Sequence, residues 1–207
     1  MLGFMAVYNV RNREIECKIV YYGPGRCGKT TNLEYIYRSF TKQVSGKMVS
    51  IDTDGDRTLF FDFLPMGIGK VMGCDVRLQL YTVPGQVKYS STRKLVLKGA
   101  DGVVFVADSM EIRREKNMVS LKDLHNNLKG YGISVFSIPL VMQYNKRDLE
   151  GQIPLMNIDQ MRGDLNAQLK VPDFEASALT GRGVGAALKE CLKLTLKSLQ
   201  RELKWVE

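Results

Sequence analysis

Apolar and polar residues alternate along the stretch IECKIVYYG, residues 15–23, where every second residue from Ile15 to Ile19 is apolar. A period of two residues is typical of a β-strand. The glycine that ends the stretch predicts that this strand runs directly into a loop. A helix is expected to follow the loop, from Lys29 to Phe40.

Five further runs are predicted to be strands. VVFVAD (Val103–Asp108) and LVMQYN (Leu140–Asn145) are short and almost wholly apolar, which is the pattern of parallel strands covered on both faces. TLFFDFLP and DVRLQLYT are predicted to form a hairpin, with a segment between them that contains Gly67, Gly69 and Gly73. FEAS is expected to be a final short strand.

Apolar residues at helical spacing fill the gaps between these strands. They are Met118, Leu121, Leu124 and Leu128 in one segment, and Leu188, Leu192, Leu196, Leu199 and Leu203 in the last one. The chain therefore alternates strand and helix from end to end, which predicts an α/β protein built on a parallel sheet.

Length and composition favour one globular domain in the cytoplasm. A chain of 207 residues with 44% hydrophobic content can bury one substantial core. No apolar run is long enough to cross a membrane, and the N-terminus MLGFMAVYNVRNRE acquires charge too early for a signal peptide. The four cysteines form no CxxC pair, so reduced thiols are expected rather than disulfides or a zinc site.

The net charge of +8 does not indicate a nucleic-acid-binding protein, because the basic residues are dispersed among acidic and apolar ones. The last predicted helix carries a basic ridge of Lys189, Lys193, Lys197 and Arg201. Such a ridge is most often a solvated helix face, although it also fits peripheral contact with anionic lipid or an acidic partner. The chain has no lipidation motif, so any membrane contact is expected to be peripheral.

The strongest functional motif is GPGRCGKT, residues 23–30, which follows the first strand and precedes a helix. This context is the one that a phosphate-binding P-loop requires. Backbone N–H groups of the loop and the helix N-terminus bind phosphate oxygens, Lys29 reaches the β and γ phosphates, and the Thr30 hydroxyl binds Mg²⁺. A plain glycine-rich turn would not require the lysine and the hydroxyl at these offsets. The predicted phosphate-binding residues are Gly23, Gly25, Arg26, Cys27, Gly28, Lys29, Thr30 and Thr31. The Arg26 side chain is expected to point outward, because the loop works through its backbone.

Two later motifs predict the base. NKRD, Asn145 to Asp148, follows the apolar run LVMQY directly, at the strand end that faces the ligand in α/β proteins. Asp148 can accept hydrogen bonds from guanine N1–H and from its exocyclic amine, which adenine cannot supply. Asn145 and Lys146 belong to the same motif, and Ser177, Ala178 and Leu179 are expected to bring a backbone N–H to guanine O6.

Together, GPGRCGKT, NKRD and SAL resemble the motifs of the Ras-like small GTPases, in the family's order, over nearly all the chain after about Glu14. The longer stretches KIVYYGPGRCGKTTNLEYIY and LYTVPGQVKYSSTRKLVLKGADGVVFVADS are similar to the prokaryotic MglA family, which regulates cell polarity and motility. This resemblance implies a P-loop NTPase fold of three α/β/α layers, with a mostly parallel six-stranded sheet and one antiparallel strand. Residues 14–207 would form the GTPase domain and residues 1–13 an N-terminal extension.

The resemblance also assigns a hydrolytic site. In TVPGQ, Thr82 stands where most relatives have an aspartate that holds a magnesium-bound water, a departure that MglA proteins share. Threonine supplies an oxygen but no charge, which predicts weaker support for Mg²⁺. Gly85 is expected to contact the γ-phosphate through its N–H, and Gln86 to orient the attacking water. Pro84 restricts the loop because its φ is fixed.

The segment DRTLFF supplies the remaining candidates. Thr58 is expected to bind Mg²⁺ together with Thr30 when GTP is present. Arg57 corresponds to the internal arginine finger of MglA-like proteins, although from spacing alone it is equally a surface arginine. Residues 31–57 and 82–91 are the two expected switch segments.

The sequence thus predicts a GTPase switch that acts slowly alone. The resemblance implies activation by an MglB-like roadblock-fold homodimer, together with polarity or motility effector proteins, and a location at the cell pole through partners. A scaffold that binds GTP without hydrolysing it is the main alternative, since Thr82 and Pro84 could mark lost chemistry. An ATP-using enzyme of the P-loop class is the second alternative, against which Asp148 argues.

Overall fold

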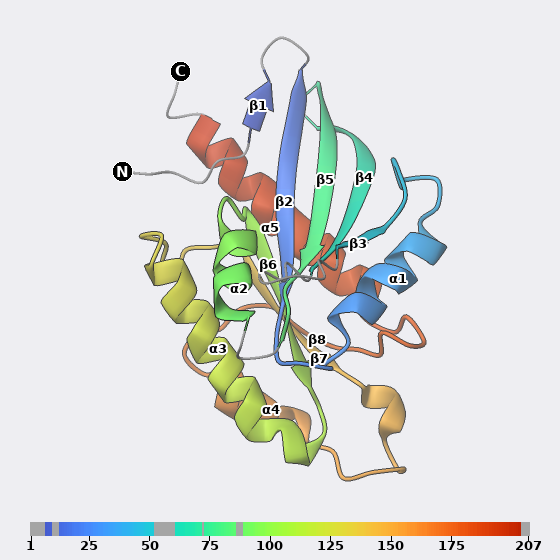
Figure 1. Cartoon of the computed structure of the whole chain (residues 1–207), viewed down its shortest axis with the longest axis vertical. Helices are drawn as coiled ribbons and strands as arrows, with labels where there is room; N and C mark the ends of the chain where they lie inside the picture. The colour runs from blue at the N-terminus through green and yellow to red at the C-terminus, as the bar shows by residue number, and fades with distance from the viewer. Residues whose placement is uncertain (1–6, 10–12, 52–60, 72, 86–88, 204–207) are drawn as a thin grey trace.

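The computed structural model describes residues 7–9, 13–51, 61–71, 73–85 and 89–203. Within them, strands and α-helices alternate from β5 to the last described helix, as Figure 1 shows. The strands are β1 (Val7–Asn9), β2 (Glu14–Tyr22), β3 (Val49–Ile51), β4 (Phe61–Val71), β5 (Cys74–Thr82), β6 (Gly102–Asp108), β7 (Leu140–Asn145) and β8 (Asp173–Glu175). The helices are α1 (Lys29–Ser39), α2 (Ser90–Leu97), α3 (Arg114–Lys129), α4 (Ile158–Leu165) and α5 (Val184–Leu203), with the 3₁₀ turns η2 (Glu111–Arg113) and η3 (Arg147–Leu149).

All the described strands form one sheet in the order β3-β4-β5-β2-β6-β7-β8, and β1 pairs with β2. The pairs from β5 through β2, β6 and β7 to β8 are parallel, whereas β4 runs antiparallel to β5. The predicted fold is therefore confirmed. Two three-residue strands, β1 and β3, extend the predicted sheet, and both pair antiparallel. Strands this short leave no periodic pattern in the sequence.

The alternating residues of β2 divide the core between the two faces of the sheet. Ile19 and Tyr21 pack in one cluster with residues of α1 and α5. Val20 and Tyr22 pack in the other with residues of α2, α3 and α4. Figure 1 shows α2, α3 and α4 together on one side of the sheet. Because β6 and β7 are buried along their whole length, both faces of the sheet centre are covered, as their apolar sequences predict.

The predicted hairpin of β4 and β5 is confirmed, but its turn lies later than expected. Gly67 and Gly69 fall inside β4, and the pairing register shifts between Gly67 and Lys70. Gly69 has a φ of 90°, a backbone conformation that glycine adopts without steric cost and that bulges often use. The glycines therefore bend the strand instead of ending it.

The topology fixes where a ligand can bind. From β2 the chain goes to β5 on one side of β2 and afterwards to β6 on the other. Ligands of open α/β sheets bind at the carboxyl ends of the strands where the strand order reverses in this way. The carboxyl end of β2 leads directly into GPGRCGKT.

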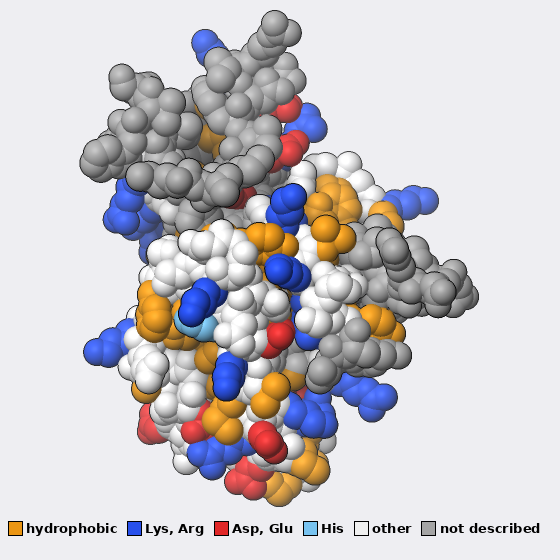
Figure 2. All heavy atoms as spheres, turned by 60° about the vertical axis from the view of Figure 1, so that its left-hand side comes forward, with side chains coloured by type: hydrophobic (Ala, Val, Ile, Leu, Met, Phe, Trp, Pro, Cys, Tyr) orange, Lys and Arg blue, Asp and Glu red, His pale blue; other side chains and the backbone are white. Residues whose placement is uncertain are grey.

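The basic side chains are dispersed on the surface, as the sequence predicts. In Figure 2 the Lys and Arg side chains are spread over the visible face, with uncharged and apolar surface between them. None of the helices in the described part of the chain has the length and apolar character needed to cross a bilayer.

Candidate nucleotide-binding site

The loop between β2 and α1 has the backbone geometry of a P-loop. Gly28 precedes α1 with a φ of 100°, and a Cβ there would lie 2.3 Å from Asn145 Nδ2. A Cβ at Gly23 would lie 2.2 Å from the carbonyl oxygen of Val106. Only glycine fits these two positions, because the backbone turns sharply and neighbouring strands pack against it.

Lys29 is held inside this loop. Its Nζ donates hydrogen bonds to the carbonyl oxygens of Gly23 and Pro24, at 3.0 and 2.7 Å, and only 6% of the residue is exposed. The ammonium lies 3.7 Å from Cys27 Sγ. Burial raises the pKa of the Cys27 thiol, and the neighbouring Lys29 charge offsets this only in part. The loop therefore contains a fixed positive charge next to an unionised thiol.

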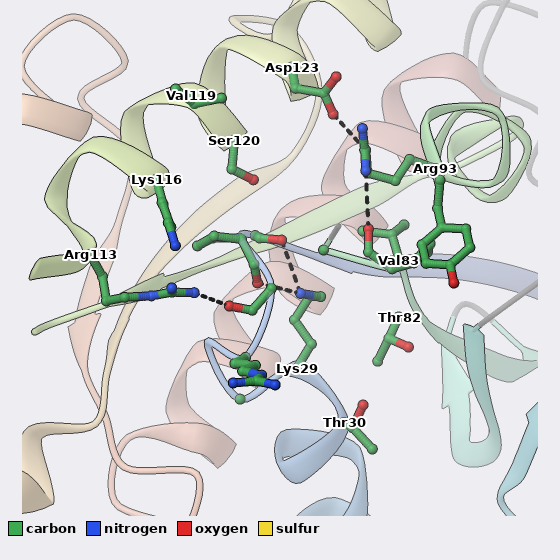
Figure 3. Close-up of a pocket in the computed structure, with 18 of the residues that line it drawn as sticks. Lys29, Thr30, Thr82, Val83, Arg93, Arg113, Lys116, Val119, Ser120 and Asp123 are labelled. Carbon is green, nitrogen blue, oxygen red and sulfur yellow. Dashed lines mark hydrogen bonds and ion pairs between the residues drawn. The ribbon is translucent and has the colours of Figure 1, made fainter. Parts of the chain in front are cut away.

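A cavity of about 1010 Å³ opens beside the loop (Figure 3). It runs from the P-loop past Thr82–Gly85 to one side of α3, where Arg113, Lys116 and Asp123 line it. Arg113 donates a hydrogen bond to the carbonyl oxygen of Gly25, which brings a second cation to the loop. Basic groups and a helix N-terminus around a cavity favour an anionic ligand such as a phosphate chain.

The motifs predicted to recognise the base lie at the same edge of the sheet. Asn145, at the end of β7, donates from Nδ2 to the carbonyl oxygen of Cys27 at 2.7 Å. Its Oδ1 accepts a hydrogen bond from the backbone N–H of Ala178 at 2.8 Å. The buried Asn145 side chain, 2% exposed, thus ties the P-loop to the SAL segment.

The rest of NKRD and SAL lies around this link. Lys146 has a φ of 71° and its Nζ lies 2.8 Å from Asp108 Oδ2. Asp148 is half-buried in η3. Ser177 is buried, whereas Leu179 is 75% exposed. The structure therefore gathers the motifs, and the guanine contacts of Asp148 and SAL stay predictions.

Asp108 is a site residue to which the sequence interpretation gave no role. Its fully buried carboxylate lies 2.8 Å from Lys146 Nζ and 3.6 Å from Arg113 Nε. Asp108 thus positions Lys146, which belongs to NKRD, and Arg113, which also contacts the P-loop. Its place at the end of the strand VVFVAD was the available signal, because strand ends face the ligand.

Residues 82–85 of TVPGQ pack directly on the P-loop. A Cβ on Gly85 would lie 2.2 Å from Gly25 N and 2.5 Å from the carbonyl carbon of Pro24. The carbonyl oxygen of Pro84 accepts a hydrogen bond from Arg93 Nη1 at 3.4 Å. Arg93 Nε also donates to Asp123 Oδ2 at 2.8 Å, so α2 and α3 both hold this segment.

Thr30, Thr82 and Asp62 form a group of oxygen atoms at the start of α1. Thr30 Oγ1 donates to Asp62 Oδ2 at 2.6 Å, and Thr82 Oγ1 donates to the same oxygen at 2.9 Å. Carboxylate and hydroxyl oxygens are ligands that Mg²⁺ accepts. Asp62 was missing from the sequence prediction, and its only signal was a carboxylate within the otherwise apolar run LFFDFLP.

The other predicted site residues are Arg26, Thr31, Arg57, Thr58 and Gln86. Arg57, Thr58 and Gln86 lie outside the described residues. Arg26 is exposed and has a φ of 63°. Thr31 lines the cavity beside Thr30.

Comparison with known proteins agrees with this geometry. The sequence model described as "Ras family" matches residues 18–197. The chain is 52% identical over 197 residues to the mutual gliding-motility protein MglA of Myxococcus xanthus, an alignment that covers 95% of this chain and 99% of the relative. It is 25% identical to the Ypt/Rab-type GTPase ypt7 of Schizosaccharomyces pombe, over 89% of this chain and 84% of that one. It is 27% identical to the Ras-related protein Rab-27B of Bos taurus, over 89% and 81%.

These similarities confirm the predicted resemblance to MglA-like, Ras-like GTPases. The residues that match the Ras family include the P-loop, NKRD and SAL. Asn145, the first residue of NKRD, links the P-loop to SAL through its two hydrogen bonds. The chain therefore belongs to the Ras family and is a small GTPase that hydrolyses GTP.

Proposed function

We propose that this GTPase is a switch that hydrolyses GTP slowly by itself and faster with an MglB-like partner, and that it controls cell polarity or motility. The observation that supports a switch is the contact of residues 82–85 with the P-loop, where the backbone of Gly85 lies against that of Gly25. A group that occupies the γ-phosphate position must act on this contact. The bound nucleotide thereby changes the position of α2 as well, because Arg93 links α2 to the same segment.

Each proposed catalytic residue has one task. Lys29 binds the phosphates and Gln86 orients the water that attacks the γ-phosphate. Arg57 stabilises the charge that develops on the transferred phosphoryl group. Mg²⁺, bound through Thr30 and Thr58, would neutralise charge on the β and γ phosphates. Hydrolysis is slow without a partner because Arg57 and Gln86 must both be in place at once.

The proposed process and partners come from the relative. The Myxococcus protein is named for gliding motility and shares 52% of its residues with this chain. We extend this to polarity or motility effectors, to activation by an MglB-like roadblock dimer, and to recruitment from the cytoplasm to the cell pole. Residues 14–207 act as the GTPase domain in this proposal.

Single-turnover GTP hydrolysis tests the proposal. Purified protein with Mg²⁺ is measured alone and with an MglB-like dimer, beside Gln86→Ala and Arg57→Ala. Arg162→Ala is the matched control, because this arginine on α4 lies outside both switch segments and has a side chain 52% exposed. We expect the dimer to accelerate wild type and Arg162→Ala, with Gln86→Ala and Arg57→Ala near background. Tight GTP binding without turnover under either condition would instead support the alternative of a scaffold that binds GTP without hydrolysing it. The presence of Thr82 in place of the usual aspartate favours that alternative.

Nucleotide competition tests the base assignment. Replacing Asp148 by Asn removes one carboxylate acceptor and introduces an amide donor, so the preference for GDP over ADP should fall at least tenfold. Unchanged selectivity would contradict the role of Asp148 without affecting the proposal about hydrolysis.

A further inference from the structure

Arg113, at the end of η2, extends to the backbone of the P-loop (Figure 3). Its Nη2 donates a hydrogen bond to the carbonyl oxygen of Gly25, a residue 88 positions earlier in the chain. Only 16% of the Arg113 side chain is exposed. A side chain from the segment before α3 therefore holds a backbone group in the middle of GPGRCGKT.

Arg113 is itself supported from the end of β6. Asn117 on α3 is 1% exposed, accepts a hydrogen bond from the Asp108 N–H at 2.9 Å and donates one to the Asp108 carbonyl oxygen at 2.8 Å. The Asp108 carboxylate accepts from the Met110 N–H through Oδ1 at 3.2 Å, and its Oδ2 lies 3.6 Å from Arg113 Nε. Supporting contacts of this kind restrict the positions that a functional side chain can take. The guanidinium is thus held in place by β6 and α3 before any nucleotide binds.

The bond to Gly25 fixes the orientation of one peptide unit, which joins Gly25 to Arg26. A trans peptide is planar, and its C=O and N–H groups point in opposite directions. Because the carbonyl oxygen of Gly25 is directed at Arg113, the N–H of Arg26 is directed away from Arg113. Arg26 has a φ of 63°, a left-handed conformation that is unfavourable for a residue with a Cβ and that persists where surrounding contacts hold it. Such a residue in a loop turns successive N–H groups toward one side, where they bind an anion.

The charge of Arg113 acts through the same peptide. A hydrogen bond from an ionised donor is stronger than one between neutral groups. Hydrogen bonds in a chain also polarise one another. The guanidinium on the carbonyl oxygen of Gly25 therefore makes the N–H of Arg26 a better donor to an anion.

We propose that Arg113 is a positioning residue for nucleotide binding, which holds the Gly25 carbonyl oxygen and thereby presents the Arg26 N–H to the phosphate chain. This inference rests on the proposed nucleotide site. Asp108, which supports Arg113, also lies 2.8 Å from Lys146 Nζ. One carboxylate therefore connects the NKRD motif with the peptide that would bind phosphate.

GDP binding by variants at position 113 tests the inference. Arg113→Met keeps an unbranched side chain and removes every donor. Arg113→Lys keeps the charge beside Asp108, but its side chain ends one bond before the position of Nη2. Arg114→Ala is the matched control, because this neighbouring arginine pairs with Asp164 on α4 and has a side chain 49% exposed. Titration of a fluorescent GDP analogue gives the affinity, and ¹H–¹⁵N NMR follows the Arg26 amide.

We expect Arg113→Met to weaken GDP binding about tenfold, because a hydrogen bond from a charged donor is lost. Arg113→Lys should weaken it about threefold, since a lysine cannot replace the planar fork of an arginine. Arg114→Ala should bind GDP like wild type. In the wild type, the Arg26 amide proton should shift downfield when GDP binds, and both variants at position 113 should reduce that shift. A residue that only stabilised the fold would lower the urea midpoint and leave the amide shift unchanged.

Wild-type GDP affinity in folded Arg113→Met or in Arg113→Lys would overturn the inference. So would a loss of affinity with an unchanged Arg26 amide shift, because Arg113 would then act on some other group. If Arg113→Met does not fold, Arg113→Lys decides by the same two measurements. Failure of the wild-type protein to bind GDP would contradict the proposed function itself, so the two failures are distinguishable.

Discussion

Replacing Asn145 with alanine should weaken both the fold and the nucleotide site, because this side chain joins two loops that are distant in sequence. It would remove the hydrogen bonds to the Cys27 carbonyl oxygen and from the Ala178 N–H, at 2.7 and 2.8 Å. Both backbone groups belong to buried residues, Cys27 at 0% and Ala178 at 4% exposure. They would then lack these partners.

The size of the effect follows from those two groups. A buried backbone group left unpaired costs about 1–3 kcal/mol, so two of them predict a loss of about 2–6 kcal/mol in the free energy of unfolding. A domain of this kind has only about 5–15 kcal/mol in total. The variant should therefore fold with reduced stability, and GDP affinity should fall at least tenfold because the P-loop and the SAL segment are no longer held together.

Asn166 offers a matched control away from the site. It has 8% exposure, its Nδ2 donates to the Val171 carbonyl oxygen at 2.8 Å, and its Oδ1 accepts from the Val171 N–H at 3.0 Å. These bonds close the loop that enters β8, so Asn166→Ala should lose comparable stability and keep its GDP affinity. Urea unfolding followed by circular dichroism, together with titration of a fluorescent GDP analogue, measures both quantities.

Two outcomes would refute this reasoning. One is an Asn145→Ala protein whose free energy of unfolding lies within about 0.5 kcal/mol of wild type. The other is an equal loss of GDP affinity in both variants, which would show that affinity follows global stability rather than the link between the loops.

Two further predictions concern close packing and buried thiols. Gly85→Ala should reduce single-turnover hydrolysis at least tenfold and also lower urea stability, because the new methyl group would lie 2.2 Å from the P-loop backbone and force it to shift. Gly163→Ala, with nothing within 4 Å of the new Cβ, is the control and should keep both quantities. Burial raises the pKa of the Cys17 and Cys191 thiols from 9.0 to about 12. The folded state then holds protons that the unfolded state releases, so stability should be full below pH 9 and fall between pH 9 and 12, by about 1.4 kcal/mol per pH unit per thiol. A flat urea midpoint across that range, or rapid alkylation of both thiols in folded protein at pH 8, would contradict this account.

The parts of the fold that were predictable from sequence depend on local patterns. The wholly apolar runs of β6 and β7 and the spacing of GPGRCGKT each lie within a few consecutive residues, so the sequence was sufficient to predict a P-loop α/β protein. The position of NKRD after a buried strand likewise predicted its place at the ligand edge. The roles of Arg57, Thr58 and Gln86 stay predictions.

What could not be predicted depends on pairing across the sheet. Asp62 reaches Thr30 only because β4 and β5 pair in one register, and a shift by one residue would turn Asp62 to the other face. The contacts of Asp108 likewise depend on Arg113 and Lys146, which other segments of the chain bring to it. Sequence periodicity indicates that a strand exists, but it does not give the register in which two strands pair.

The contacts of Lys29 make the phosphate site preorganised. A free lysine side chain carries about 2 kcal/mol of rotamer entropy, and here the carbonyl oxygens of Gly23 and Pro24 restrict that freedom before any nucleotide arrives. The ordering takes place during folding, so nucleotide affinity is in part a property of loop stability. By the same linkage, a bound nucleotide should raise the melting temperature of the domain. Substitutions that loosen the loop can then lower affinity without touching the nucleotide.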